Sequence, residues 1–239
     1  MDLGLRDRVA LVTGASAGLG RATAMALAAE GVRLIVVARR SDELNDLVAS
    51  CGVAARALVA DLSDPETPQT AVDLALATFG RLDILIANGG GPPAKKPLDA
   101  TPADHDAAYH LLYTPLTRLI GAAAIPMRAQ KWGRIAIVGS TSILAPKDVL
   151  SLSGAMRSAL WLWSKAAAPA LAADGVTINM LLPGLHATER ARSLGLDTPG
   201  RPLGNPDDFG KAAAFLCSEH ARFITGTKLV IDGGDTAAA

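Results

Sequence analysis

A glycine-rich turn is the first feature of the chain whose residue types and spacing point to chemistry. The apolar segment Val9–Thr13 ends in Gly14-Ala15-Ser16-Ala17-Gly18-Leu19-Gly20, and a helical pattern follows directly. Glycines let the backbone turn sharply and let a pyrophosphate approach closely, and the start of a helix offers free N–H groups. The turn therefore predicts a phosphate cradle, although a similar turn can also join a strand to a helix without any ligand.

Polar or small residues also follow the other segments that we expect to be strands. Ligands of parallel α/β sheets bind at the carboxyl ends of the strands, so we expect these residues to line one site with the glycine-rich turn. They are Arg39 and Arg40 after the second strand, Asp61 and Leu62 after the third, Asn88, Gly89 and Gly90 after the fourth, Ser140 after the fifth, and Pro183, Gly184 and Thr188 after the sixth.

Short β-branched segments alternate with longer helical patterns, which is typical of a parallel sheet covered on both faces. We predict a single doubly wound α/β domain over residues 1–239, with a parallel sheet of about seven strands. The expected strands are Val9–Thr13, Leu34–Ala38, Ala57–Ala60, Ile84–Ala87, Arg134–Val138, Val176–Leu182 and Lys228–Ile231. The expected helices are Gly20–Glu30, Ser41–Ser50, Pro65–Phe79, Thr101–Gln130 (broken, with Pro115 inside), Ser151–Ala173 and Pro206–Ser218.

Composition argues against several other classes of protein. Half of the 239 residues are hydrophobic, so the chain can bury a core without disulfides or metal ions. Lys plus Arg and Asp plus Glu balance at 23 each, which argues against a nucleic-acid or membrane-surface partner. Cys51 and Cys217 are too few for a disulfide framework or a zinc site, so we expect buried free thiols and no metal. We find no signal-peptide or membrane-span pattern and expect a cytoplasmic location.

The order of these motifs resembles that of the short-chain dehydrogenase/reductase family over essentially the whole chain. Thr13–Gly20 has the family spacing TGxxxGxG, and Asn88-Gly89-Gly90 is similar to the NNAG turn. Arg201–Pro206 is similar to the RxGxP turn, and the segment 224–234 is similar to the ending ITGxxxxVDGG.

The resemblance implies a Rossmann fold that binds a nicotinamide dinucleotide, with the adenine near Asp61 and Leu62. It also implies a small-molecule substrate, a lid between the sixth strand and Arg201, and a homotetramer or homodimer. Arg190 and Arg192 lie in that lid, where they could contact a carboxylate or a phosphate, or could simply be solvated.

The residues at the end of the second strand indicate whether the chain binds NAD(H) or NADP(H). An acidic residue there would accept hydrogen bonds from the ribose 2′-OH of NAD, but the chain has Arg39 and Arg40. Arginine suits a 2′-phosphate through charge-assisted contacts, to which Ser16 could add a hydroxyl. We therefore expect NADP(H) rather than NAD(H). NAD(H) stays open because Ala17 stands where some users of NADP carry a basic residue.

The catalytic positions depart from the family pattern of a serine followed by YxxxK. Ser140 matches the serine, but the other two positions hold Ser153 and Arg157, and the family's asparagine falls near Tyr113. An alcohol is a poor proton donor, and arginine does not deprotonate in a useful range. We expect Ser140 to polarise the substrate and Ser153 to orient it. Arg157 is expected to hold the ribose or to stabilise developing negative charge.

Several routes around the missing acid stay open. Tyr113 or Tyr109 replaces the acid, water or Ser140 protonates the product, the substrate needs no acid, or the protein binds NADPH without turnover. The chain also resembles a divergent branch of the family with the same SxxxR change and a turn like the one here, Gly89-Gly90-Gly91-Pro92-Pro93. We expect an oxidoreductase that transfers hydride from NADPH to a ketone, 3-oxoacyl compound, enone or imine. The alternative is a catalytically inert NADP-binding regulatory or structural protein.

Overall fold

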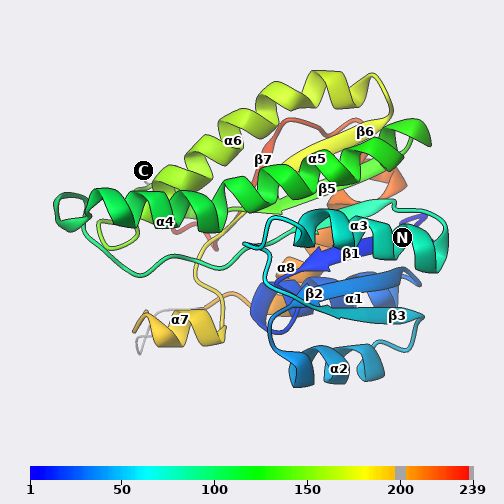
Figure 1. Ribbon diagram of the computed structural model, residues 1–239, viewed down its shortest axis with the longest axis horizontal. Coiled ribbons are helices and arrows are strands. Elements are labelled where there is room, and N and C mark those ends of the chain that lie inside the picture. Colours follow the sequence, from blue (N-terminus) through cyan, green and yellow to red (C-terminus); the bar gives the residue numbers. More distant parts are fainter. Residues whose placement is uncertain (197–202, 237–239) are drawn as a thin grey trace.

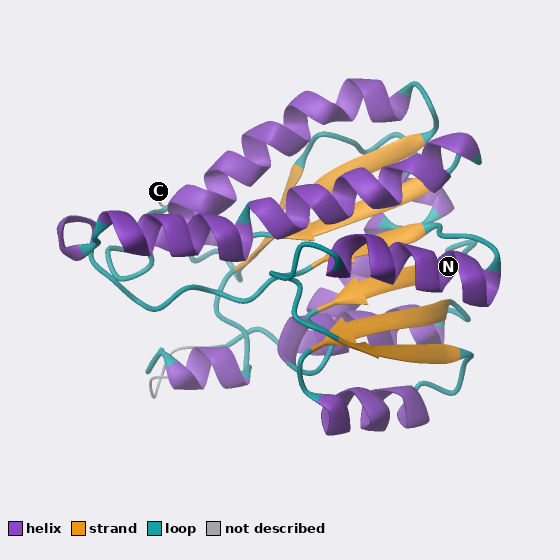
Figure 2. Cartoon of the chain, in the orientation of Figure 1, coloured by secondary structure: helices purple, strands orange, loops and turns teal. Residues whose placement is uncertain are grey.

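The computed structural model describes residues 1–196 and 203–236, and it shows one α/β domain with a central sheet between two layers of helices (Figures 1 and 2). The strands are β1 (Val9–Thr13), β2 (Arg33–Ala38), β3 (Ala55–Val59), β4 (Ile84–Ala87), β5 (Gly133–Val138), β6 (Val176–Pro183) and β7 (Lys228–Ile231). The helices are α1 (Gly18–Ala29), α2 (Ser41–Ser50), α3 (Thr67–Phe79), α4 (Pro102–Leu112), α5 (Thr114–Ala129), α6 (Ser151–Ala172), α7 (Glu189–Ser193) and α8 (Pro206–Leu216), with short 3-10 turns η1 (Pro97–Asp99), η2 (Thr141–Ile143) and η3 (Glu219–Ala221).

The sheet confirms the predicted fold class. Within the described residues it has seven strands in the order β3-β2-β1-β4-β5-β6-β7, and all neighbours are parallel. The strand order reverses between β1 and β4. In open α/β sheets, the crevice at such a reversal is where ligands bind.

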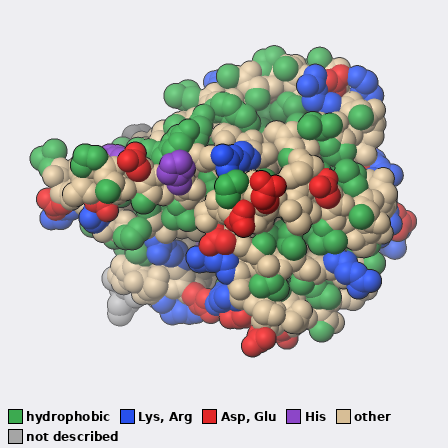
Figure 3. Space-filling view, viewed as in Figure 1, with side chains coloured by type: hydrophobic (Ala, Val, Ile, Leu, Met, Phe, Trp, Pro, Cys, Tyr) green, Lys and Arg blue, Asp and Glu red, His purple; other side chains and the backbone are tan. Residues whose placement is uncertain are grey.

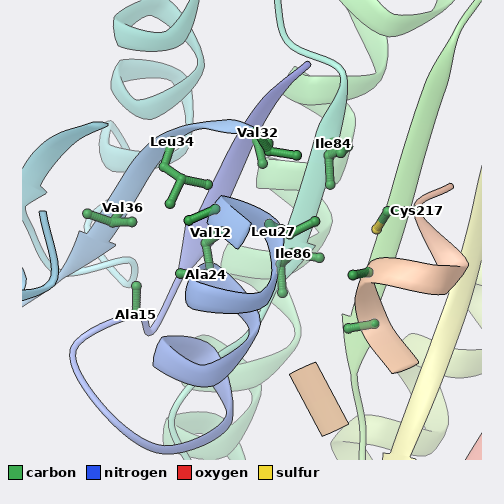
Figure 4. Packing of buried hydrophobic residues seen from close by; sticks show 14 of the residues in the cluster. Val12, Ala15, Ala24, Leu27, Val32, Leu34, Val36, Ile84, Ile86 and Cys217 are labelled. Atoms are coloured by element: carbon green, nitrogen blue, oxygen red, sulfur yellow. The ribbon is translucent and has the colours of Figure 1, made fainter. Parts of the chain in front are cut away.

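Two apolar cores form because alternate residues of each strand point to opposite faces of the sheet. On β1, Ala10 and Val12 belong to the core beneath α1, α2 and α8, whereas Val9 and Leu11 belong to the core beneath α3, α5 and α6. Figure 4 shows part of the first core, where Leu27 of α1 lies among side chains of β1, β2 and β4. Both faces of the sheet are buried, which explains the nearly continuous apolar strands.

Several predicted boundaries need correction. The segment 101–130 is broken as expected, but it breaks at Tyr113, and Pro115 lies in the first turn of α5, where a missing N–H costs nothing. The third strand ends at Val59, so Asp61 and Leu62 lie in the following turn. The short helix α7 was not predicted.

The two cysteines are free and buried, as the sequence predicts. Burial raises the pKa of the Cys217 thiol to about 12, so this thiol stays protonated at neutral pH. None of the described helices is both long and apolar enough to cross a membrane. Figure 3 shows acidic and basic side chains interspersed over the face in view.

A buried carboxylate ties the start of β4 to the start of β1. Asp83 has a fully buried side chain, and it accepts hydrogen bonds from Arg81 at 2.6 and 2.7 Å and from the backbone N–H of Val9 at 2.9 Å. Arg8 adds a second cation at 3.3 Å. This carboxylate therefore fixes the edge of the sheet that lies opposite the ligand-binding edge.

Replacing this carboxylate tests its contribution to stability. Asp83→Ala leaves the Val9 N–H and Arg81 without their partner, while Arg8 keeps Glu219 at 2.7 Å, and we expect it to lower the free energy of unfolding by about 3 kcal/mol. Urea denaturation measures the change. Asp73→Ala, which removes an exposed carboxylate from α3, is the control and should change stability by less than about 0.5 kcal/mol. Equal stability of the two variants would contradict the assignment.

Candidate functional site

The glycine-rich turn folds into a cradle whose shape only glycine allows. Gly14 and Gly18 have positive φ angles of 61° and 54°. A Cβ on Gly20 would lie 2.2 Å from the carbonyl oxygen of Gly14, so the start of α1 packs directly on the turn. Ala17 caps α1 without a side-chain hydrogen bond, and the first turn has no acidic residue. The N–H groups and the positive end of the helix are therefore free to bind a pyrophosphate, so the cradle fits a dinucleotide.

Hydrogen bonds join this cradle to the turn after β4. The hydroxyl of Thr13 accepts from the backbone N–H of Asn88 at 2.9 Å and donates to the Asn88 carbonyl oxygen at 2.9 Å. The side-chain amide of Asn88 donates to the carbonyl oxygen of Gly14 at 3.4 Å. Gly89 packs beside Leu112, whereas a Cβ on Gly90 would meet nothing within 4 Å. In the turn after β4, Gly89 therefore packs against the protein, whereas Gly90 has open space beside it.

The residues predicted for the adenosine end lie together after β2 and β3. Arg39 is 75% exposed and pairs with Asp61 at 3.7 Å, so its guanidinium is accessible to a ligand. Hydrogen bonds from Ser63 lower the pKa of the Asp61 carboxyl, with a smaller contribution from the charge of Arg39. Leu62 is half-buried against the core beneath α3. A bound phosphate would therefore compete with Asp61 for Arg39.

Arg40 connects three parts of the same region. Its Nε donates to the hydroxyl of Ser16 at 3.3 Å, and its Nη1 pairs with Glu43 at 3.1 Å and with Glu189 of α7 at 3.3 Å. Ser16 and Arg40, which the sequence predicts to act at one phosphate site, are thus neighbours. The pairing with Glu189 was not predicted.

Thr188 brings α7 against the cradle. Its hydroxyl accepts from the N–H of Ala191 at 3.2 Å and so caps α7, and its methyl group lies 3.4 Å from the Cβ position of Gly18. A hollow of about 490 Å³ opens here between α1 and α7. The residues that line it include Ser16, Gly18, Arg21, Glu43, Thr188, Glu189 and Arg192.

The end of β6 has a structural role. Pro183 is the last residue of the strand, and the N–H of Gly184 donates to the Ile231 carbonyl at 2.9 Å. A Cβ on Gly184 would lie 2.6 Å from Asp232. His186 is buried, bonds to the carbonyl of Gly184 at 3.1 Å and packs against Phe209. Pro183 and Gly184 therefore shape the entrance to α7.

Ser140 lies just after β5, at the start of η2, with its hydroxyl already engaged as an acceptor. Its Oγ accepts from the backbone N–H of Ser142 at 3.1 Å and from the Ser142 hydroxyl at 2.9 Å. The hydroxyl proton of Ser140 is thereby left free for a substrate oxygen, and the two incoming bonds strengthen it as a donor. Ser142 was missed by the sequence analysis, since a serine two positions after a strand end gives no signal by itself.

Arg157 is a buried cation at the end of β5. Its side chain comes from α6, its Nη1 donates to the carbonyl oxygen of Val138 at 2.5 Å and its Nε donates to Ser153 at 3.2 Å. Burial lowers the pKa of Arg157 to about 10, with a smaller contribution from the charge of Arg190, so the guanidinium stays protonated at neutral pH. Ser153 thus holds Arg157, and the structure brings Ser140, Ser153 and Arg157 to one place.

Tyr113 lies at the junction of α4 and α5. Its ring stacks on Tyr109 with a centroid separation of 5.2 Å and packs against the core beneath α5. Its hydroxyl makes no hydrogen bond within the described residues, so no contact joins it to Ser140 or Arg157.

Part of one predicted motif lies outside the described residues. Arg201 and Pro202 of the turn that resembles RxGxP belong to that part, and so does the end of the predicted lid. Among the described residues, no cluster of three or more His, Cys, Asp or Glu side chains could hold a metal ion.

Comparison with known proteins finds dehydrogenases and reductases that match nearly the whole chain. A family model described as enoyl-(acyl carrier protein) reductase matches residues 14–236. Cyclohexanol dehydrogenase of Rhodococcus sp. (strain TK6) is 32% identical over 265 residues, covering 98% of each chain. The 3-oxoacyl-[acyl-carrier-protein] reductase of Escherichia coli is 29% identical, covering 97% of this chain and 98% of the relative.

Solved structures agree with this result. L-sorbose reductase from Gluconobacter frateurii, complexed with NADPH and L-sorbose, superposes with a TM-score of 0.91 at 28% identity and 99% coverage of both chains. A 7α-hydroxysteroid dehydrogenase complexed with NADH and 7-oxo glycochenodeoxycholic acid has a TM-score of 0.91 at 28% identity, covering 98% of this chain and 96% of its own.

The cradle can be tested with a matched pair of glycine substitutions. Gly20→Ala places a methyl group against the carbonyl of Gly14, so the turn must shift and its N–H groups move away from the phosphates. Overpacking costs about 1–3 kcal/mol, so we expect dinucleotide affinity to fall about tenfold or more in a calorimetric titration.

Gly121→Ala is the control. A Cβ on this exposed glycine of α5 meets nothing within 4 Å, so binding should not change and the helix should gain about 1 kcal/mol in stability. Unchanged affinity in Gly20→Ala would show that the turn does not hold the cofactor.

Proposed function

Since this chain belongs to the short-chain dehydrogenase/reductase family, we propose that it uses NADPH to reduce a carbonyl-type small molecule, such as a ketone, 3-oxoacyl compound, enone or imine. One observation carries the proposal. A cradle suited to a pyrophosphate and a serine hydroxyl free to donate to a substrate oxygen lie on the same edge of one sheet, after β1 and after β5.

The preference for NADPH over NADH rests on charge at the end of β2. Arg39 and Arg40 follow the strand, and Ser16 lies within hydrogen-bond distance of Arg40. These groups would hold the 2′-phosphate, the cradle from Gly14 to Gly20 the pyrophosphate, and Asp61 and Leu62 the adenine. The turn Asn88-Gly89-Gly90, Arg157, Pro183, Gly184 and Thr188 would surround the rest of the dinucleotide.

In the proposed reaction, the bound reduced nicotinamide supplies the hydride. Ser140 donates a hydrogen bond to the substrate oxygen, and Ser142 keeps the Ser140 hydroxyl turned towards it. Arg157 stabilises the negative charge that grows on this oxygen as the carbonyl carbon is reduced, while Ser153 holds Arg157 in place. A proton from water, passed through Ser140, completes the alcohol, because the site has no phenol in the family position.

We further propose a cytoplasmic homotetramer or homodimer with no nucleic-acid or membrane partner. The exposed apolar side chains of Ile125 on α5 and Leu162 on α6, which are 70% and 65% exposed, would support burial between subunits. Size-exclusion chromatography coupled to light scattering measures the assembly.

The cofactor preference has a direct test. We expect NADPH to bind at least tenfold more tightly than NADH, and Arg39→Asp to weaken NADPH about 10–100-fold, as expected for loss of a charge-assisted contact. NADH affinity should hold or improve. Arg56→Asp, which makes the same charge change at an exposed residue of β3, is the control. Equal affinity for both dinucleotides in the unmodified protein would contradict the preference, and binding of neither would remove the oxidoreductase proposal.

The serine pair makes a second prediction. Ser140→Ala removes the donor to the developing oxyanion and should lower kcat about 10²–10³-fold without changing the Kd for NADPH. Ser142→Ala should cause a smaller loss, about tenfold, because Ser142 acts through Ser140. Steady-state oxidation of NADPH gives kcat, and Ser50→Ala on the exposed part of α2 is the control.

Tyr113 is the competing acid, and Tyr113→Phe decides between the two routes. Its hydroxyl has no bond to the site, so we expect kcat to stay within about twofold of the unmodified protein. A loss as large as that of Ser140→Ala would make Tyr113 the acid. Tight NADPH binding without turnover of any ketone, enone or imine would favour the alternative, a catalytically inert NADP-binding protein.

A further inference from the structure

Arg157 is a buried cation that lacks an anionic partner. The residue is 8% exposed, and the groups that accept its hydrogen bonds, the Val138 carbonyl and the Ser153 hydroxyl, are both neutral. No carboxylate lies within ion-pair distance of it among the described residues. A guanidinium out of water without a counter-charge is unfavourable, so this position favours an incoming anion.

A second guanidinium reaches the same edge of the sheet from α7. The Nη2 of Arg190 donates to the carbonyl of Pro92 at 2.9 Å and lies 3.0 Å from the Cβ position of Gly91. Arg190 also makes no ion pair with any residue of 1–196 or 203–236. Its neighbour Glu189 pairs instead with Arg40.

Both cations contact segments of the chain at the carboxyl end of two neighbouring strands, β4 and β5. Gly91 and Pro92 belong to the turn after β4, and Val138 ends β5; the two strands are paired, with Ala87 opposite Ile137. Arg157 binds the carbonyl of the last residue of β5, and Arg190 binds the carbonyl of Pro92 in the segment that follows the neighbouring strand β4. The lowering of the Arg157 pKa by the charge of Arg190 agrees with this proximity. Figure 1 shows α7 beyond the carboxyl ends of the strands, next to the connection that leaves β4.

The positions proposed above for the 2′-phosphate and the pyrophosphate of the cofactor lie at the ends of strands other than β5. The first lies after β2, three strands from β5, and the second lies after β1, two strands from β5. At about 4.8 Å per strand, the pyrophosphate cradle is about 10 Å from the end of β5. Arg157 is therefore placed for an anion on the substrate side.

We propose that the substrate is an oxo acid whose carboxylate binds between Arg157 and Arg190, while its carbonyl oxygen meets Ser140. The inference rests on the proposed function and names the substrate class of the same site. A guanidinium has five N–H donors; Arg157 uses two of them for Val138 and Ser153 and Arg190 uses one for Pro92, so both keep donors for carboxylate oxygens. The carboxylate is unchanged in the reaction: hydride adds to the carbonyl carbon, the carbonyl oxygen takes a proton from water, and the dinucleotide leaves oxidised.

Matched acids and esters test the proposal in the full-length protein. The probes are 2-oxo and 3-oxo acids of increasing chain length, each paired with its methyl ester, and kcat and KM are measured with NADPH. We expect the unmodified protein to prefer the acid. Arg190→Gln should raise the KM of the acid about 10–100-fold and leave the KM of the ester unchanged, while Arg118→Gln, an exposed position on α5, should change neither.

Calorimetric titration of NADPH into Arg190→Gln shows whether Arg190 binds the carboxylate of the substrate or the pyrophosphate of the cofactor. An unchanged Kd supports a substrate carboxylate. A Kd that weakens by the same factor, with no change in the ratio of acid to ester, would show that Arg190 binds the cofactor pyrophosphate and would overturn the inference.

Equilibrium binding of the corresponding hydroxy acid to the protein saturated with NADP⁺ gives a readout that needs no turnover. Binding that Arg190→Gln weakens supports the carboxylate site, and no binding overturns it. Turnover of esters without any preference for acids would leave the proposed function in place and remove only this inference.

Discussion

The hydrogen bonds between Thr13 and Asn88 are the constraint on which the rest of the site depends. They join the ends of β1 and β4, the two strands between which the strand order reverses. Because the Asn88 amide also reaches the carbonyl of Gly14, the cradle and the turn after β4 are held as one unit. The cradle positions α1, and the turn after β4 provides the carbonyl that Arg190 binds. Thr13 and Asn88 therefore fix the position of the glycine-rich cradle relative to the turn after β4.

The chemistry of the site depends on two positions that differ from the family pattern. Ser153 stands at the position of the tyrosine, whose pKa can be tuned, and Arg157 stands at the position of the lysine. A phenol beside an ammonium group can give up its proton near neutral pH, but a serine beside a guanidinium cannot. In the proposed mechanism the buried Arg157 would compensate in part, since it would bring a positive charge to the place where the substrate oxygen becomes negative. The site is thus better suited to stabilising charge than to moving protons, and it favours substrates that accept hydride readily or bring a negative group of their own.

The sequence predicted the fold well because both faces of the sheet are buried. Each strand is then a short apolar segment, and several of the candidate site residues come soon after a strand end, as Asn88 and Ser140 do. The break in the segment 101–130 was expected, but its position at Tyr113 was not, because a proline is tolerated in the first turn of a helix and so Pro115 does not mark the boundary. The helix α7 was missed since it has five residues, too few for a periodic pattern, although Thr188 followed by Glu189 is a capping signal. The bond of Arg190 to Pro92 joins segments far apart in the sequence, and the bond of Ser142 to Ser140 depends on the local shape of a turn; spacing along the chain shows neither.

The central claim is that this protein transfers hydride without the phenol of its family. The most direct test is to supply NADPH carrying deuterium at C4 of the nicotinamide, together with oxo acids and neutral ketones, and to analyse the products by mass spectrometry. The account predicts an alcohol that carries one deuterium on the former carbonyl carbon. NADPH that binds tightly but stays unoxidised, with no deuterium in any product, would contradict it.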